Sequence, residues 1–335
     1  MSQHTSDRRI PGNASGLYTL VVFVSLVLVL LVVILSAYLR LSGSGLGCTE
    51  WPACYALIKA EASGAESLAA AHLVPPWATM THRLVASALG LLVLGITIMA
   101  LHRRREESRQ PVLIPLALLG LTVFLSVLGY ITPSPLLPWV TLSNLLGGMA
   151  MLAMLWWLGQ RSVSSITENL PGHELRPWAL VGIFIVFFQI ALGGWVSANF
   201  AALACTDLPG CGGYPWSGGP WRESFNLSRV LPATDAGAVI TGDTGKIIHL
   251  AHRAGAVLTF LYLAWLGWRA IGSGNRYRST GMTLLIFLLL QMVLGLGAVA
   301  FSLPLGLVTA HNAMAALLLL AVVNLNHLLT PRTRK

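Results

Sequence analysis

Charged side chains are scarce in this chain. Lys, Arg, Asp and Glu together make up 10% of its 335 residues, while hydrophobic residues make up 55%. Average globular proteins carry about 25% charged residues, so this scarcity excludes a soluble domain. The composition is that of an integral membrane protein.

Acidic residues are the scarcer charge type, with 12 Asp and Glu against 21 Lys and Arg, and the formal net charge is +9. A basic stripe that could bind nucleic acid is missing. The basic residues instead form short groups beside the ends of apolar runs, as in the cytoplasmic loops of membrane proteins. We therefore expect contact with membrane lipid and no nucleic-acid partner. These groups lie at 103–105, 161, 269–278 and 332–335.

A signal-peptide cleavage site is also missing. The first 16 residues are polar and include Arg8 and Arg9, and the apolar run after them is too long for a signal-peptide core. This run lacks a small-residue cleavage motif. We expect it to be retained as the first membrane helix.

Apolar runs long enough to cross a bilayer recur along the chain. They predict an all-α integral membrane protein with eight transmembrane helices. If the N-terminus is cytoplasmic, the basic loops and both tails, 1–16 and 330–335, are cytoplasmic too. The long loops, about 40–78 and 198–246, then face outward from a bacterial-type inner (plasma) membrane. The expected spans lie near 17–39, 80–101, 112–131, 139–159, 177–197, 247–267, 280–301 and 305–328.

The two long loops contain an internal repeat. Residues 48–54 read CTEWPAC and residues 205–211 read CTDLPGC. In an outward, oxidising compartment a short disulfide within each pair is the expected state, and it would contribute about 2 to 3 kcal/mol in the chain-entropy model. A zinc site is disfavoured because neither loop has a histidine in ligand spacing. A redox role stays open. The four cysteines are Cys48, Cys54, Cys205 and Cys211.

A His-Arg pair follows each cysteine loop at the same place in the next span, as His82-Arg83 and as His252-Arg253. Four spans return the chain to its starting side, so the two copies have one orientation. We predict a parallel repeat of two four-helix bundles, 17–160 and 177–329. A cytoplasmic linker, 161–176, joins them.

The second bundle has histidines near its outer side on two helices. His252 and His311 each lie about four to six residues from the outer end of their spans, roughly 6 to 9 Å at 1.5 Å per residue. Four-helix bundles build cofactor sites from inward side chains on facing helices. Two imidazoles at one depth suit the axial ligation of a haem iron.

Other polar residues lie in the same spans as the candidate histidines or in neighbouring spans. Arg253 and Arg83 are placed to meet a haem propionate, or alternatively to reach lipid headgroups. His249 suits a cofactor-contacting or acid-base role, with packing as the alternative. Gln189 and Gln291 are expected to form hydrogen bonds between helices.

Together these segments resemble the haem A synthase family. The resemblance covers nearly the whole chain and implies an enzyme that oxidises the methyl group of haem O to the formyl group of haem A for cytochrome c oxidase biogenesis. The matching segments are YLRLSGSGLGCTEWPACY after the first span, THRLVASALGLL in the second, LLGGMAMLAMLWWL in the fourth, GGWVSANFAALACTDLPGC after the fifth and IHLAHRAGA in the sixth.

The resemblance also implies the site residues. Its C-terminal histidine pair, which holds haem b, corresponds to His252 and His311. Its N-terminal bundle takes the substrate haem, and its first histidine there corresponds to His82. Haem O synthase or oxidase assembly factors are the implied partners, and a homo-oligomer stays open.

Two positions depart from the family pattern. Thr79 stands where the family typically has a glutamate, and Asn144 stands where it has a second N-terminal histidine. A hydroxyl cannot replace an ionisable carboxylate, and a neutral amide is a poor iron ligand.

These departures leave two interpretations. In the first, the N-terminal site works with His82 alone and the chain is a synthase. In the second, the chain is a non-catalytic haem b-binding paralogue that acts in electron transfer or oxidase assembly. A transporter is disfavoured because the ionisable groups lie near the outer face rather than at the midplane.

Overall fold

The computed structural model is all-helical within the residues that it describes. Helix α7 and the 3-10 turn η1 are short, and the other helices are long. The described residues are 13–41, 76–106, 112–131, 137–163, 173–202, 204–205, 207–208, 210–212, 218–232 and 241–330.

Eight of the described helices are long and apolar enough to cross a membrane, which confirms the predicted number of spans. The chain is therefore a multi-pass membrane protein. The helices are α1 (Asn13–Leu41), α3 (Pro76–Glu106), α4 (Leu113–Ile131), α5 (Pro138–Val163), α6 (Arg176–Ala198), α8 (Gly242–Gly272), α9 (Asn275–Ala300) and α10 (Leu305–Leu329), and the short elements are η1 (His173–Leu175) and α7 (Trp221–Ser224).

Several helices extend beyond the expected spans. Helix α1 begins at Asn13 rather than at 17, and α8 begins at Gly242 rather than at 247. Polar residues at these ends continue the backbone hydrogen-bond ladder past the apolar segment. Helices α3 and α5 both begin with a proline, which fits the first turn because its missing N–H has no partner there.

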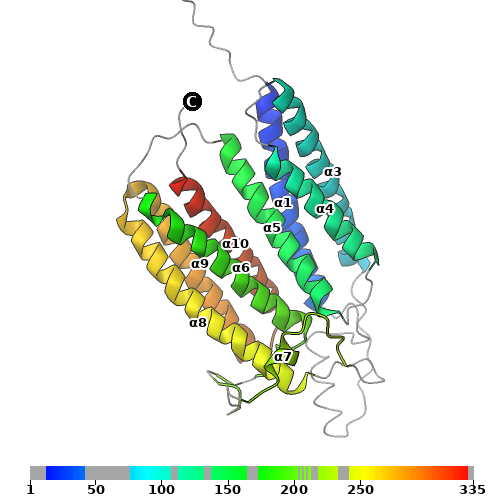
Figure 1. Cartoon of the computed structure of the whole chain (residues 1–335), viewed down its shortest axis with the longest axis vertical. Coiled ribbons are helices and arrows are strands. Elements are labelled where there is room, and N and C mark those ends of the chain that lie inside the picture. The colour runs from blue at the N-terminus through cyan, green and yellow to red at the C-terminus, as the bar shows by residue number, and fades with distance from the viewer. Residues whose placement is uncertain are drawn as a thin grey trace, which may run out of the picture.

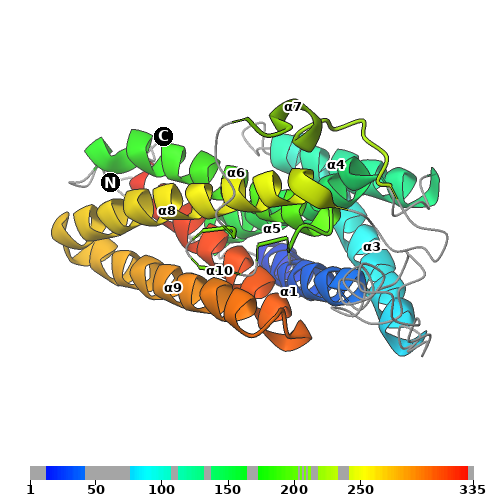
Figure 2. The ribbon, with the colours of Figure 1, turned by 90° about the horizontal axis from the view of Figure 1, so that it is seen from below.

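The long helices form two rings of four (Figures 1 and 2). Helix α1 packs against α3 and α5, and α4 closes this ring by packing against the same two helices. Helix α6 likewise packs against α8 and α10, and α9 closes the second ring. Helices α8 and α10 thus lie opposite each other. The parallel-repeat relation between the two rings stays a prediction.

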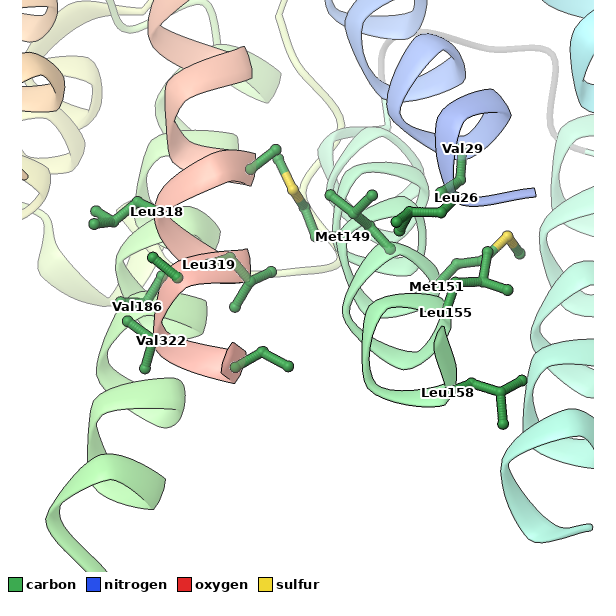
Figure 3. Packing of buried hydrophobic residues seen from close by; sticks show 14 of the residues in the cluster. Leu26, Val29, Met149, Met151, Leu155, Leu158, Val186, Leu318, Leu319 and Val322 are labelled. Atoms are coloured by element: carbon green, nitrogen blue, oxygen red, sulfur yellow. The ribbon is translucent and has the colours of Figure 1, made fainter. Parts of the chain in front are cut away.

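The two rings meet along α1, α5, α6 and α10. Leucine, valine and methionine side chains fill this seam, and Figure 3 labels Leu155 on α5 with Leu319 and Val322 on α10. A polar bridge also crosses it, because the side chain of Gln160 donates a hydrogen bond to Asn324 at 2.6 Å. Apolar packing and a few interhelical hydrogen bonds thus hold the halves together.

We call the end of the molecule that carries α7 and the Cys205–Cys211 loop the loop end (Figure 1). Helix α1 begins and α10 ends at the opposite end. Trp195 of α6 is 3% exposed and donates from its indole N–H to the carbonyl oxygen of Ser224 at 2.8 Å. This bond ties α7 to the second ring.

Candidate functional site

The predicted ligand candidates lie on opposite helices of the second ring, His252 on α8 and His311 on α10. Both are partly buried, and they are close enough for their charges to interact. Because α8 begins earlier than expected, His252 lies further from the start of its helix than the sequence suggested. The two residues still lie on opposite helices of the same ring.

Each imidazole is hydrogen-bonded to a glutamine on a neighbouring helix, which confirms the expected interhelical bonds. The amide nitrogen of Gln189 on α6 lies 3.0 Å from Nδ1 of His252 and 3.0 Å from the carbonyl oxygen of the same residue. The amide nitrogen of Gln291 on α9 lies 3.1 Å from Nε2 of His311. All four helices of the ring therefore contribute to this site.

Glycines make room for the two imidazoles. A Cβ atom on Gly193 would lie 2.9 Å from Cε1 of His252, and one on Gly295 would lie 2.9 Å from Cε1 of His311. Real Cβ atoms essentially never come that close, so any other residue at either position would displace an imidazole.

The donor set fits haem rather than a bare metal ion. Within the described residues, no group of three or more His, Cys, Asp or Glu side chains could hold a metal ion. Two imidazoles suffice when the porphyrin supplies the other ligands of the iron. Nδ1 of His311 is buried and lacks a hydrogen-bond partner in the described part of the chain. A pair of imidazoles on opposite helices of one ring fits a haem iron.

Arg253, beside His252, binds the cysteine loop. Its guanidinium donates to the carbonyl oxygens of Cys205 at 2.7 Å, of Asp207 at 2.6 Å, and of Gly210. The expected Cys205–Cys211 disulfide is present, with Cα atoms 4.6 Å apart and both residues almost fully buried. Arg253 thus fixes the disulfide loop over the ring, and its contact with a propionate stays a prediction.

His249 lies one turn before His252 and is 4% exposed. Its imidazole lies close to the backbone of Ala201, and its Nδ1 is buried without a hydrogen-bond partner among the described residues. The contact with Ala201 joins α8 to the segment after α6. His249 therefore has a packing role, and a role toward a cofactor stays a prediction.

The N-terminal candidates lie on opposite helices of the first ring. Thr79, His82 and Arg83 are on α3, and Asn144 is on α5. Arg83 is exposed, whereas Thr79, His82 and Asn144 are partly buried. Helices α3 and α5 have the same relation in their ring as α8 and α10 in theirs. Cys48 and Cys54 lie outside the described residues.

Comparison with known proteins identifies the family of this chain. The family described as cytochrome oxidase assembly protein matches residues 19–323, which include every helix of both rings except the outermost ends. The chain belongs to this family. The resemblance stated from the sequence motifs is therefore confirmed.

Several relatives of this chain are named "Heme A synthase". One, from Shewanella oneidensis, is 37% identical over 324 residues, which cover 91% of this chain and 94% of the relative. Another, from Granulibacter bethesdensis, is 25% identical and covers 88% of this chain and 83% of the relative. A third, from Bacillus licheniformis, is 24% identical and covers 86% and 88%. The chain is thus similar to proteins of that name over most of its length.

One feature of the site was not predicted from the sequence. The sequence marked Gln189 and Gln291 only as interhelical partners, and it did not single out Gly193 and Gly295. The available signal was a repeat, because residues 189–193 read QIALG and residues 291–295 read QMVLG. In each helix these residues place a glutamine and a glycine one turn apart on the same face.

Proposed function

We propose that this chain oxidises the methyl group of haem O to the formyl group of haem A for cytochrome c oxidase biogenesis. The observation that carries the proposal is the whole-length match to relatives named "Heme A synthase", together with an imidazole pair inside the second ring. The similarity extends over both rings, as expected if both are needed for activity.

The second ring is the proposed haem b site. His252 and His311 would hold the haem, and bound haem b would supply a one-electron carrier. Arg253 would close the loop end through the Cys205–Cys211 segment and keep water from the ring. His249 would support α8 through Ala201.

The first ring is the proposed substrate site. His82 would contact the substrate haem from α3, with Arg83 toward a propionate. Thr79 and Asn144 would line the same ring as neutral side chains, so His82 would be the one imidazole there. An asparagine in place of a second histidine would leave one side of the substrate open.

The proposed membrane orientation follows from the charge distribution. Basic residues lie in the last turn of α3 at 103–105 and around the α8–α9 turn at 269–278. Both groups lie at the end opposite the Cys205–Cys211 loop, and positive loops favour the cytoplasmic side. The loop end and its disulfide would then face outward, in the compartment where disulfides persist.

Activity can be tested in a bacterium that makes haem O but lacks its own haem A synthase. Expression of this chain is expected to produce haem A, which extraction and chromatography separate from haem O and haem b. An empty vector supplies the control. Persistent haem O without haem A, in membranes that contain the folded protein with its haem b, would contradict the proposed reaction.

A further inference from the structure

The glutamine that contacts His252 lies against a glycine of α8. Its amide lies between the imidazole and Gly255, where a Cβ atom would collide with Oε1 of Gln189. Gly193, one turn after Gln189 on α6, makes the matching space for the ring. The positions of the amide and of the imidazole therefore depend on each other.

Helices α6 and α9 each carry a glutamine and a glycine one turn apart, and the two helices also end alike. The N–H of Ala201 bonds the carbonyl oxygen of Val196 at 2.9 Å, and the N–H of Leu303 bonds that of Ala298 at 2.7 Å. Such bonds define a Schellman end. Phe200 (φ 54°) and Ser302 (φ 57°) take the left-handed conformation there, each the same distance along the chain from its glutamine.

The two glutamines nevertheless meet different nitrogens. Gln189 lies against Nδ1 of His252 and leaves Nε2 clear of it, whereas Gln291 lies against Nε2 of His311. An imidazole that binds a metal through one nitrogen carries its proton on the other, and a hydrogen bond to that proton fixes the tautomer and the ring orientation.

Gln189 can satisfy that proton. Its Oε1 is buried and has no hydrogen-bond partner among the described residues. A half-turn of the amide, which gives up its bond to the carbonyl oxygen of His252, would bring Oε1 to the proton on Nδ1 of His252. With the iron on Nε2 of His311, Gln291 would not serve in this way, because its amide lies against that nitrogen.

We propose that Gln189 is a positioning residue for the haem b ligand His252, and that Gln291 is displaced from Nε2 when His311 becomes a ligand. This inference rests on the proposed haem b site. Once Oε1 of Gln189 accepts the Nδ1 proton, His252 has Nε2 free for the iron. His311 exchanges its amide partner for the iron.

The test compares three glutamine-to-methionine variants of the full chain, since methionine is unbranched and of similar length. Gln189→Met is expected to weaken haem b binding by roughly 10- to 100-fold, the usual cost of losing such a partner. It should also raise the midpoint potential, because the ligand loses an acceptor that increases its basicity. Transfer of haem to apomyoglobin and a redox titration measure the two effects.

The control Gln160→Met should match the unaltered protein in both measurements, and Gln291→Met should bind haem b at least as tightly, because the amide that competes for Nε2 of His311 is gone. Gln160 is a matched control because it lies on α5 and bonds Asn324 rather than a histidine. If Gln189→Met behaved like Gln160→Met, the positioning role would be overturned. If Gln291→Met weakened binding as much as Gln189→Met, the displacement of Gln291 would be overturned.

Two further variants keep the test decisive if Gln189→Met does not accumulate. Gln189→Glu retains an oxygen for the Nδ1 proton and should keep haem b at a lowered potential. Gly255→Ala displaces the amide without removing it and should weaken haem binding. An unchanged potential in the first, or unchanged binding in the second, would overturn the inference. Absence of haem b from the unaltered protein would instead refute the proposed site.

Discussion

Purified His252→Ala and His311→Ala variants are expected to have lost haem b. Each replacement removes one of the two imidazoles that meet inside the second ring, and alanine offers no ligand. Loss of a residue that merely supports a metal ligand costs roughly 10- to 100-fold in affinity, so we expect loss of a ligand itself to cost at least about 100-fold. The pyridine haemochrome spectrum of the purified protein measures the haem b content per chain.

The matched control for these variants is His102→Ala. His102 is an exposed histidine of α3 and lies toward the end opposite the loop end. This variant should keep its full haem b content. Full haem b content in His252→Ala or His311→Ala would show that the iron takes its ligands elsewhere.

The His82→Ala variant is expected to keep haem b and to lose haem A formation. His82 is in the first ring, away from both His252 and His311, so the second ring should remain intact. Misplacement of a reacting group by about 1 Å can cost about 100-fold in rate, and we expect at least that loss when the substrate haem loses its imidazole. Haem A formed in membranes that also contain haem O measures the rate.

The departures at Thr79 and Asn144 sharpen this prediction. With a neutral hydroxyl and a neutral amide in the first ring, His82 would be the one family-matched ligand for the proposed substrate haem. If His82→Ala formed haem A as fast as the unaltered protein, the first ring would not be the substrate site. Joint loss of haem b and haem A formation would contradict the assignment of separate sites to the two rings.

The helices were predictable because each apolar run has the length of a bilayer span. The residues at which the helices begin and end were harder to predict. Helix α8 begins at Gly242, within a segment that is too polar to count as membrane-spanning but that still forms backbone hydrogen bonds. Periodicity and hydropathy therefore identify the spans, but they do not show where a helix ends outside the membrane.

The ligand candidates of the site could be selected from the sequence, but the contacts that support them could not. The sequence selected His252 and His311 by their depth in the bilayer, and the structure brings them together. It could not predict that Arg253 bonds three carbonyl oxygens of the disulfide loop, because that contact depends on how the loop folds back over α8. The pairing of Gln189 with His252 likewise depends on the packing of α6 against α8.

The central claim is that one chain holds haem b in its second ring and converts haem O in its first. The most direct test is to purify the unaltered protein from cells that make haem O, and to determine its haems by extraction and chromatography. The account predicts one haem b per chain, accompanied by haem A. Haem b alone, in protein from cells rich in haem O, would contradict the synthase function and leave only the second ring as a haem site.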